Sequence, residues 1–262
     1  MALNRKIAYI DLSTGEVEVT PIPLEVRKKY LGGRGLDAYL LYNHTQKGCD
    51  PLGPGNALII SGGILTATCA SATARTHIMA KSPLTGLLGS ANMGGFFAPE
   101  MAWAGFHHLV ITGKAESPVY LFIHNNTVEI RDAEHLWGRM TTDTQWAIRE
   151  ELGDEEVKSC VIGPAGENLV RYANVMTGIK NAAGRLTRAR ANPRETVVLP
   201  SPWAALTTPM RRSRRSWASA RTRARAGGDS AGTRGCARRG GSAETGACTG
   251  SYQRQVKRRC PA

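Results

Sequence analysis

Residues 6–21 read KIAYIDLSTGEVEVTP, and this stretch decides the fold class. Apolar and polar residues alternate on both sides of Ser13-Thr14-Gly15, which predicts a β-hairpin. Residues 117–132, SPVYLFIHNNTVEIRD, repeat the pattern around Asn125-Asn126. At an offset of 111 positions Tyr9 falls on Tyr120, and the apolar residues of the second strand also coincide. We infer that the chain contains two copies of one hairpin.

Each hairpin leads into the same succession of elements, although chance alternation can imitate a single hairpin. A helical pattern follows, then an apolar strand that ends in glycine, then a loop and a further strand. The sequence therefore predicts an α+β fold in which a duplicated hairpin-helix-strand unit forms two related β-sheets. The two sets of segments are helices at 24–42 and 141–152, strands at 57–62 (ALIISG) and 158–163 (KSCVIG), and strands within ARTHIMAKS and LVRYANVMT.

The charge of the chain is divided unevenly along the sequence. The whole chain carries a formal net charge of +13. Residues 185–262 contain 18 Lys plus Arg and three acids, and residues 1–184 therefore hold 16 bases and 18 acids. The first part is nearly neutral, with a net charge of −2, and the basic character belongs to the second part alone. This boundary divides the chain into a domain at 1–185 and a basic, low-complexity tail at 186–262.

The sequence shows no features of a secreted or membrane-spanning protein. MALNRKIAYIDLSTG runs directly into the first strand without an apolar signal region. No apolar run approaches the ~20 residues that span a bilayer. The six cysteines form no C-x-x-C pair, so no zinc or iron–sulfur motif is complete. We expect a cytoplasmic protein without a membrane partner.

The segment ATARTHIMAKSPLTGLLGSANMGGFF gathers residues that suit a phosphate group. Glycines such as Gly94 allow close approach to backbone N–H groups, and successive N–H groups form an anion-binding nest. Arg75 can hold a phosphate through a bidentate fork. The alternative is that Pro83-Leu84-Thr85-Gly86 is an ordinary turn and Arg75 a solvated cation. Spacing alone does not decide between the two interpretations.

A second glycine-rich segment, GIKNAAGR at 178–185, again places small residues beside an arginine. Neither G-x-x-x-x-G-K-[ST] nor G-x-G-x-x-G is present, so the standard nucleotide loops are excluded. His107 and His108 are adjacent and direct their side chains differently, which argues against a metal site.

Seven segments together resemble the N-terminal domain of the aldehyde:ferredoxin oxidoreductase family, whose members are tungsten or molybdenum enzymes with a pterin cofactor. The resemblance covers about 185 residues in the right order. It implies a domain on which a bis-pterin metal cofactor sits, with Mg²⁺ bridging the two pterin phosphates. The segments are IDLSTGEV, YLGGRGLDAYLLY, AKSPLTG, SANMGGFFAPEM, AGFHHLVITGKAESPVYL, IGPAGENLVRYANVM and NAAGR.

The resemblance also implies which residues contact the cofactor. Asn92 and the carbonyl oxygen of Ala183 would be Mg²⁺ ligands, and oxygen ligands suit this ion. Both glycine-rich segments would then serve one ligand and converge on one surface. The residues that would contact the pterin are Arg75, Asn92, Gly94, Ala183, Gly184 and Arg185.

After NAAGR the sequence departs from the family. The family's further domains carry the cysteine ligands of a [4Fe–4S] cluster, and those ligands are absent from this chain. Three interpretations of the tail are open: an out-of-frame or truncated gene product, a basic arm for nucleic acid, and an inert linker. Each predicts a disordered tail, because its few large apolar residues cannot offset chain entropy.

The resemblance implies an oxidoreductase that converts aldehydes to carboxylates and passes electrons to ferredoxin. We expect this chain to contribute cofactor binding and to be inactive by itself. An aryl-CoA ring reductase subunit of the same family is an alternative. A second alternative is a non-catalytic protein that binds nucleic acid through the tail, and we regard nucleic acid as an unlikely partner.

Overall fold

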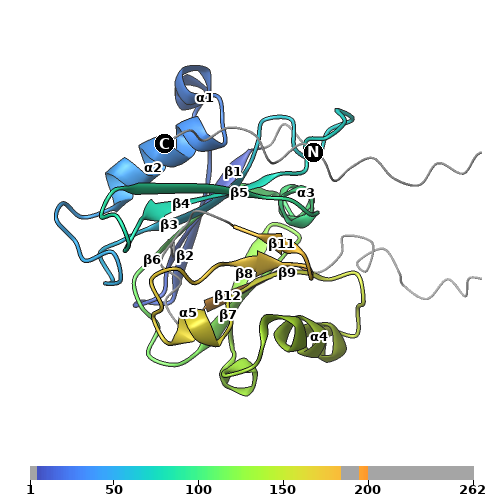
Figure 1. Cartoon of the computed structure of the whole chain (residues 1–262). Helices are drawn as coiled ribbons and strands as arrows, with labels where there is room; N and C mark the ends of the chain where they lie inside the picture. Colours follow the sequence, from blue (N-terminus) through green and yellow to red (C-terminus); the bar gives the residue numbers. More distant parts are fainter. Residues whose placement is uncertain (1–4, 184–194, 200–262) are drawn as a thin grey trace, which may run out of the picture. The chain divides into compact units, whose positions relative to one another are not determined.

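The computed structural model describes residues 5–183 and 195–199, the latter as backbone, and contains two six-stranded sheets (Figure 1). The first sheet has the order β2-β1-β6-β3-β4-β5 and the second β8-β7-β12-β9-β10-β11. The first sheet comprises β1 (Lys6–Asp11), β2 (Glu16–Pro21), β3 (Leu58–Gly62), β4 (Thr76–Lys81), β5 (Leu88–Met93) and β6 (Phe106–Thr112), and the second β7 (Val119–His124), β8 (Thr127–Asp132), β9 (Lys158–Val161), β10 (Met176–Thr177), β11 (Asn181–Ala182) and β12 (Glu195–Leu199).

The two sheets have the same topology, which confirms the predicted α+β fold with two related sheets. Each begins with a hairpin, β1–β2 or β7–β8, whose first strand pairs in parallel with the last strand of the set. The remaining neighbours pair antiparallel in both sheets. Tyr9 and Tyr120 occupy matching places, because each lies on the first strand and faces the helix that covers its sheet.

The helices cover the outer faces of the sheets, and the main core lies between the sheets. Alternation along the strands explains this division: Ala8 and Ile10 of β1 face the main core, whereas Ile7 faces the helices. Helices α1 (Leu24–Tyr30) and α2 (Arg34–His44) pack on the first sheet, and α4 (Thr141–Leu152) packs on the second. Helix α3 (Phe97–Trp103) contributes to the main core. The remaining described helices are α5 (Pro164–Glu167) and a 3₁₀ turn at Glu134–Leu136.

Two expectations about element boundaries were wrong. The helix predicted at 24–42 is two helices, because Leu31 and Gly33 adopt positive φ angles of 63° and 52° that a continuous helix excludes. The strand predicted within 169–177 is reduced to the two residues of β10, and Leu169 at φ 58° belongs to the irregular segment before it. The helix predicted at 141–152 is confirmed with the same bounds.

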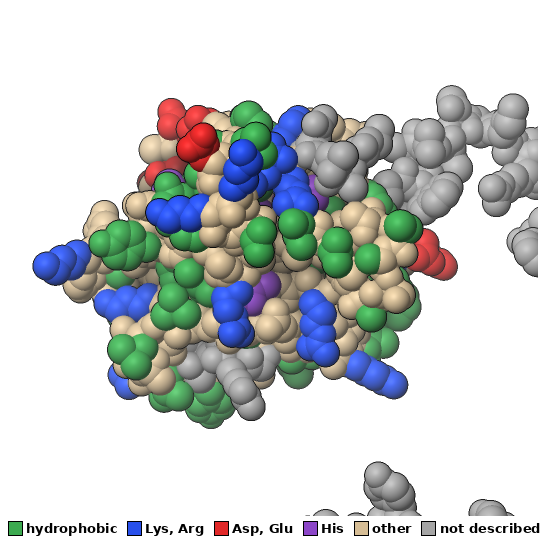
Figure 2. Space-filling model, turned by 90° about the horizontal axis from the view of Figure 1, so that it is seen from above, with side chains coloured by type: hydrophobic (Ala, Val, Ile, Leu, Met, Phe, Trp, Pro, Cys, Tyr) green, Lys and Arg blue, Asp and Glu red, His purple; other side chains and the backbone are tan. Residues whose placement is uncertain are grey.

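β12 lies within the range that the sequence assigned to the tail. Its five residues pair with β7 and β9 and so belong to the second sheet. The domain boundary at Arg185 stays a prediction, as does the disorder of the tail, because residues 184–194 and 200–262 lie outside the described part of the chain. Figure 2 shows the face that lies uppermost in Figure 1, where both acidic and basic side chains occur.

Candidate functional site

The first glycine-rich segment forms one end of the β4–β5 hairpin. Thr76 pairs with Met93, so Arg75 and Gly94 are the next residues outward on the two strands. The Thr76 hydroxyl accepts a hydrogen bond from the Ala98 N–H of α3 at 3.1 Å, which attaches this end of the hairpin to the core. Arg75 and Asn92 are exposed. Both side chains are therefore available to a ligand at this end of the hairpin.

The second glycine-rich segment forms the turn between β10 and β11 and the residues that follow it. Gly178 adopts φ 59°, and Thr177 pairs with Asn181 across the turn. The Ala183 N–H donates to the Val175 carbonyl at 2.9 Å, and the Ala183 side chain is buried in the main core. Only the main chain of Ala183 can therefore serve a ligand.

The two segments lie side by side, although they are far apart in the sequence. A Cβ atom added at Gly94 would lie 3.0 Å from Asn181 Oδ1, and one added at Gly95 would lie 3.1 Å from Asn181 Nδ2. Gly95 also has φ +96°, which disfavours any side chain. The contact brings Arg75, Asn92 and Gly94 near the strand that precedes Ala183, while Gly184 and Arg185 fall outside the described residues.

Asn181 was not predicted as a site residue. Its side chain lies against both glycines and joins the first sheet to the second. The only sequence signal was its polar side chain next to the A-A-G-R motif. A carboxamide carries both donors and an acceptor, so this residue can contact either a phosphate oxygen or a cation.

A cavity of about 390 Å³ borders Asn181 on the side of α4. Gln145 Nε2 donates to the Gly178 carbonyl at 3.2 Å and ties α4 to the β10–β11 turn. The Arg149 guanidinium lies 4.9 Å from the centre of the exposed Trp146 ring. With Lys180 also in its lining, the cavity has cationic walls next to the glycine contact.

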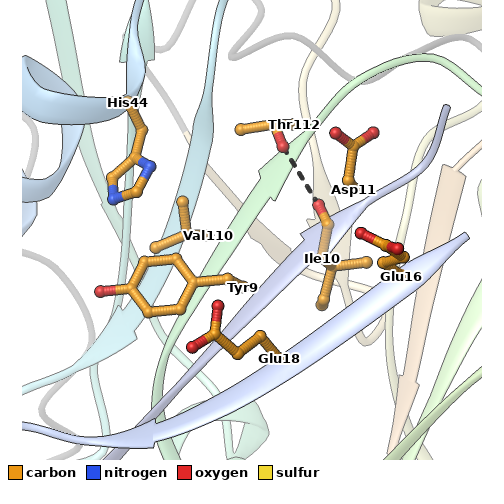
Figure 3. A pocket seen from close by; sticks show the side chains of 8 residues that line it. All are labelled: Tyr9, Ile10, Asp11, Glu16, Glu18, His44, Val110 and Thr112. Atoms are coloured by element: carbon orange, nitrogen blue, oxygen red, sulfur yellow. Dashed lines mark hydrogen bonds between the residues drawn. The ribbon is translucent and has the colours of Figure 1, made fainter. Parts of the chain in front are cut away.

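A second cavity, of about 270 Å³, lies on the first sheet and is lined by Tyr9, Glu18 and His44 among others (Figure 3). The Tyr9 and His44 ring centres are 5.0 Å apart. Burial raises the pKa of the Tyr9 hydroxyl above its ordinary value. The described residues contain no group of three or more His, Cys, Asp or Glu side chains that could hold a metal ion.

A chain of buried polar side chains runs beneath α2. The carboxylate of Asp37 accepts a hydrogen bond from the Ser61 hydroxyl at 2.5 Å and contacts His77 Nδ1 directly. His77 Nε2 lies 2.9 Å from the Ser90 hydroxyl on β5. His108 Nε2 lies 3.4 Å from the other carboxylate oxygen. These residues come from α2 and four strands, and none of them was predicted from the sequence as a functional residue.

Strand β6 carries two adjacent buried histidines, His108, which contacts Asp37, and its neighbour His107. The register between β1 and β6 shifts after Lys6, so that His107 is an extra residue in β6. Burial lowers the pKa of His108, and burial with the neighbouring His108 lowers the pKa of His107 to about 4. Both imidazoles are neutral near pH 7.

The corresponding interface in the second sheet is built without charges. With Tyr9 matched to Tyr120, the strand pairings match Ile59 and Met79 to Val161 and Met176. Gly163 and Asn174 therefore stand where the first copy has the cross-strand pair Ser61 and His77. The buried positions of α2 between Leu36 and Leu40 recur in α4 between Thr144 and Ile148, which matches Asp37 to Gln145. The Thr144 hydroxyl donates to the Met140 carbonyl at 3.1 Å. The second copy of the unit thus closes the same helix–sheet interface with neutral residues.

Comparison with known proteins identifies the family of this fold. The model of a family described as aldehyde ferredoxin oxidoreductase, N-terminal domain, matches residues 7–188. The chain belongs to the aldehyde ferredoxin oxidoreductase family. The predicted resemblance is therefore confirmed, and the match ends three residues after Arg185.

Two relatives of the chain are named as tungsten-containing enzymes. The tungsten-containing aldehyde ferredoxin oxidoreductases of Pyrococcus furiosus and Thermococcus kodakarensis are 48% and 47% identical over 176 residues, which is 67% of this chain and 29% of each relative. The WOR-like subunit of an aliphatic sulfonate oxidoreductase from Pyrococcus furiosus is 38% identical over 199 residues. The chain thus spans less than a third of the length of these relatives.

A solved structure of the same family type supports the fold. The active-site complex BamBC of benzoyl coenzyme A reductase with 1,5-dienoyl-CoA superposes with a TM-score of 0.73 at 35% identity. The match covers 76% of this chain and 31% of the other. None of the helices in the described ranges is long and apolar enough to cross a membrane.

Proposed function

We propose that residues 1–185 form the pterin-cofactor-binding domain of a tungsten or molybdenum oxidoreductase. The observation that carries this proposal is the contact of Gly94 and Gly95 with Asn181, which places the two glycine-rich segments at one surface. Such a contact crowds a Cβ atom at either glycine, and the absence of side chains there allows a ligand to approach the backbone N–H groups closely. The names of the relatives add tungsten as the metal.

The donors at this surface fit a phosphate-bearing cofactor with Mg²⁺. Arg75 offers a guanidinium that matches phosphate oxygens, and Asn92 offers a carboxamide oxygen of the kind that Mg²⁺ prefers. The main chain of Ala183 would supply a carbonyl oxygen, and Gly184 and Arg185 would add an N–H group and a second guanidinium. In the proposed enzyme the metal-pterin group supplies the two-electron redox chemistry.

The role of this chain's own residues is to bind and orient that group. Arg75 would neutralise one phosphate, and the two hairpin ends would fix the direction of the cofactor through several contacts at once. The cationic cavity with Arg149 and Lys180 borders the same surface. It would raise the local concentration of an anionic ligand.

Titration calorimetry with inorganic pyrophosphate and Mg²⁺ tests the site. Arg75→Ala should weaken pyrophosphate binding by roughly 10- to 100-fold, since a hydrogen bond to a charged group contributes about 1.5–3 kcal/mol. Asn92→Ala should reduce the Mg²⁺ dependence of binding. Lys47→Ala, which removes an exposed positive charge from the loop after α2, is the matched control and should leave binding unchanged. Equal losses in the Arg75 and Lys47 variants would refute a specific site.

Aldehyde oxidation with ferredoxin as acceptor is the reaction we propose for the complete enzyme, as named for the relatives. A [4Fe–4S] cluster would carry the electrons, and its ligands are not among the residues of this chain. We expect the purified 262-residue chain, loaded with cofactor, to show no dye-linked aldehyde oxidation. Turnover above the background of free cofactor would contradict this expectation.

The structural neighbour favours a second candidate. A benzoyl coenzyme A reductase subunit shares the fold at 35% identity, so a ring reductase of aryl-CoA thioesters is the alternative activity. Binding of an aryl-CoA, with competition by pyrophosphate, would favour it over an aldehyde oxidoreductase. Nucleic-acid binding through the tail remains a separate prediction, and a steep loss of DNA affinity with added salt would support it.

A further inference from the structure

The buried polar chain beneath α2 has the order Ser90–His77–Asp37. The Ser90 hydroxyl lies 2.9 Å from His77 Nε2, and His77 Nδ1 contacts the Asp37 carboxylate. With the proton on Nδ1 and donated to Asp37, Nε2 is the nitrogen that accepts from the serine. This is the relation of nucleophile, general base and orienting carboxylate found in serine hydrolases of unrelated folds. From this geometry we propose that Ser90 is an activated nucleophile that accepts acyl groups from esters or thioesters with good leaving groups.

Asp37 and His77, the orienting part of the buried polar chain, are held rigidly. Asp37 is fully buried and accepts a second hydrogen bond from Ser61 at 2.5 Å. His77 is 4% exposed, so water does not compete for its contact with the carboxylate. A buried carboxylate that holds the proton on Nδ1 fixes the imidazole tautomer and leaves the Nε2 lone pair directed at the serine.

Ser90, at the reacting end of the buried polar chain, is more accessible to solvent than Asp37 and His77. Ser90 is only part-buried, and its neighbours on the same face of β5, Leu88 and Asn92, are exposed. β5 ends the sheet, and no further described strand pairs with its outer edge. An edge strand leaves alternate N–H groups unpaired, and these are donors for the oxygen of a tetrahedral intermediate.

The internal repeat shows that the fold does not require the buried polar chain of Asp37, His77 and Ser90. The second copy of the unit has Gln145, Gly163 and Asn174 at the corresponding positions, and so lacks the carboxylate and the imidazole. A buried carboxylate is costly to desolvate, and replacing buried charged groups by well-packed neutral residues is often neutral or stabilising. The retention of Asp37 and His77 in one copy alone therefore points to chemistry rather than packing.

The reaction needs only the acyl compound and water. The Ser90 oxygen bonds to the acyl carbon while its proton passes to His77 Nε2. The bond to the leaving alcohol or thiol then breaks, and that group takes the proton from Nε2. Water repeats the two steps on the acyl-serine, which releases a carboxylic acid and restores the hydroxyl. This activity does not depend on cofactor binding and goes beyond the proposed function.

A fluorophosphonate probe tests the proposal on the intact chain. Intact mass and peptide mapping should show one adduct, on Ser90, formed with loss of fluoride. His77→Gln should slow labelling, and the hydrolysis of p-nitrophenyl acetate, on the order of 10²-fold, the usual size of general-base catalysis. Ser90→Ala should abolish both. Ser71→Ala, at an exposed loop serine, is the matched control and should leave both rates unchanged.

A second variant separates chemistry from folding. The triple substitution Asp37→Thr, Ser61→Val and His77→Met replaces the buried part of the polar chain by neutral side chains of comparable size, and should retain the wild-type circular dichroism spectrum while losing the Ser90 adduct. The proposal is overturned when the folded wild-type chain leaves Ser90 unlabelled. It is equally overturned when labelling survives His77→Gln or the triple substitution at the wild-type rate.

Discussion

The two sheets share one strand order but are joined to their covering helices by different interactions. Beneath α2 the first sheet holds Asp37, His77 and Ser61 in a buried hydrogen-bonded chain. Beneath α4 the second sheet packs Val161 and Met176 as the first packs Ile59 and Met79 beneath α2, but it has Gly163 and Asn174 where the first has Ser61 and His77. Apolar alternation along the strands is common to both sheets, so alternation suffices for the topology. The polar chain is an addition to one copy, and its cost and role can be measured against the other copy.

The largest difference should come from removing one buried polar side chain from each covering helix. Asp37→Ala leaves the buried His77 and Ser61 without their acceptor and should lower the free energy of unfolding by about 2–6 kcal/mol, since each unsatisfied buried group costs about 1–3 kcal/mol. Thr144→Val removes one hydroxyl that bonds within its own helix and should cost about 1 kcal/mol or less. Urea unfolding followed by circular dichroism measures both. Similar costs would show that the two interfaces do not differ in the way described.

Acid should destabilise the first sheet through His107. The folded pKa of His107 is about 4, below the ordinary 6.5, so the unfolded chain binds more protons between these values. Stability is therefore retained above pH 6.5 and falls as the pH decreases toward 4, by about 3 kcal/mol at most. Glu100 acts oppositely over the same interval, so urea midpoints at pH 7 and pH 4.5 are measured in a Glu100→Gln background, where adding His107→Phe should flatten the profile. An unchanged slope in that variant would assign the acid sensitivity elsewhere.

A rise in pH from 4.5 to 7 should lower the stability of the protein through Glu100 of α3, which lies beside β9 of the second sheet. Burial raises the pKa of Glu100 from 4.5 to about 7. The folded protein thus binds more protons between these values, and its stability falls as the pH rises from 4.5 to 7, again by about 3 kcal/mol at most. Glu100→Gln should remove this loss in thermal unfolding at pH 5 and pH 8. A variant that still loses stability over this interval would contradict the assignment.

The smallest effect concerns the contact between the two copies. Gly95→Ala introduces a Cβ atom 3.1 Å from Asn181 Nδ2 at a positive φ, whereas Gly86→Ala places one at a positive φ with nothing within 4 Å. Both should cost about 1 kcal/mol for the backbone conformation. The Gly95 variant should cost up to about 1 kcal/mol more, for the crowding. Thermal unfolding measures this difference, and Asn181→Ala should abolish it; a difference that persists would place the crowding elsewhere.

Much of the secondary structure could be predicted because its signals are local. The hairpins at Ser13-Thr14-Gly15 and Asn125-Asn126 follow from alternation over a few residues, and α4 follows from its apolar period. The break between α1 and α2 was not predicted, since it depends on the positive φ angles of Leu31 and Gly33. Periodicity carries no information about such backbone angles when the flanking helices share one apolar face.

The candidate site was predicted only in part, for the same physical reason. Arg75, Asn92 and Gly94 were found through their composition and the resemblance to the family, and Asn181 was not. The contact of Asn181 with Gly94 and Gly95 arises because the two sheets pack face to face. Nothing in either segment alone specifies that packing.

The amino-acid sequence by itself determined the duplication, the α+β class and the family, because each of these rests on short-range patterns and on short sequence motifs. Tertiary structure alone decided the parallel pairing of β1 with β6 and the meeting of the two glycine-rich segments. It also decided the alignment of Asp37, His77 and Ser90, which are separated by 40 and 13 positions along the chain. Such contacts depend on burying apolar faces over long chain separations, and packing fixes which polar side chains then face one another.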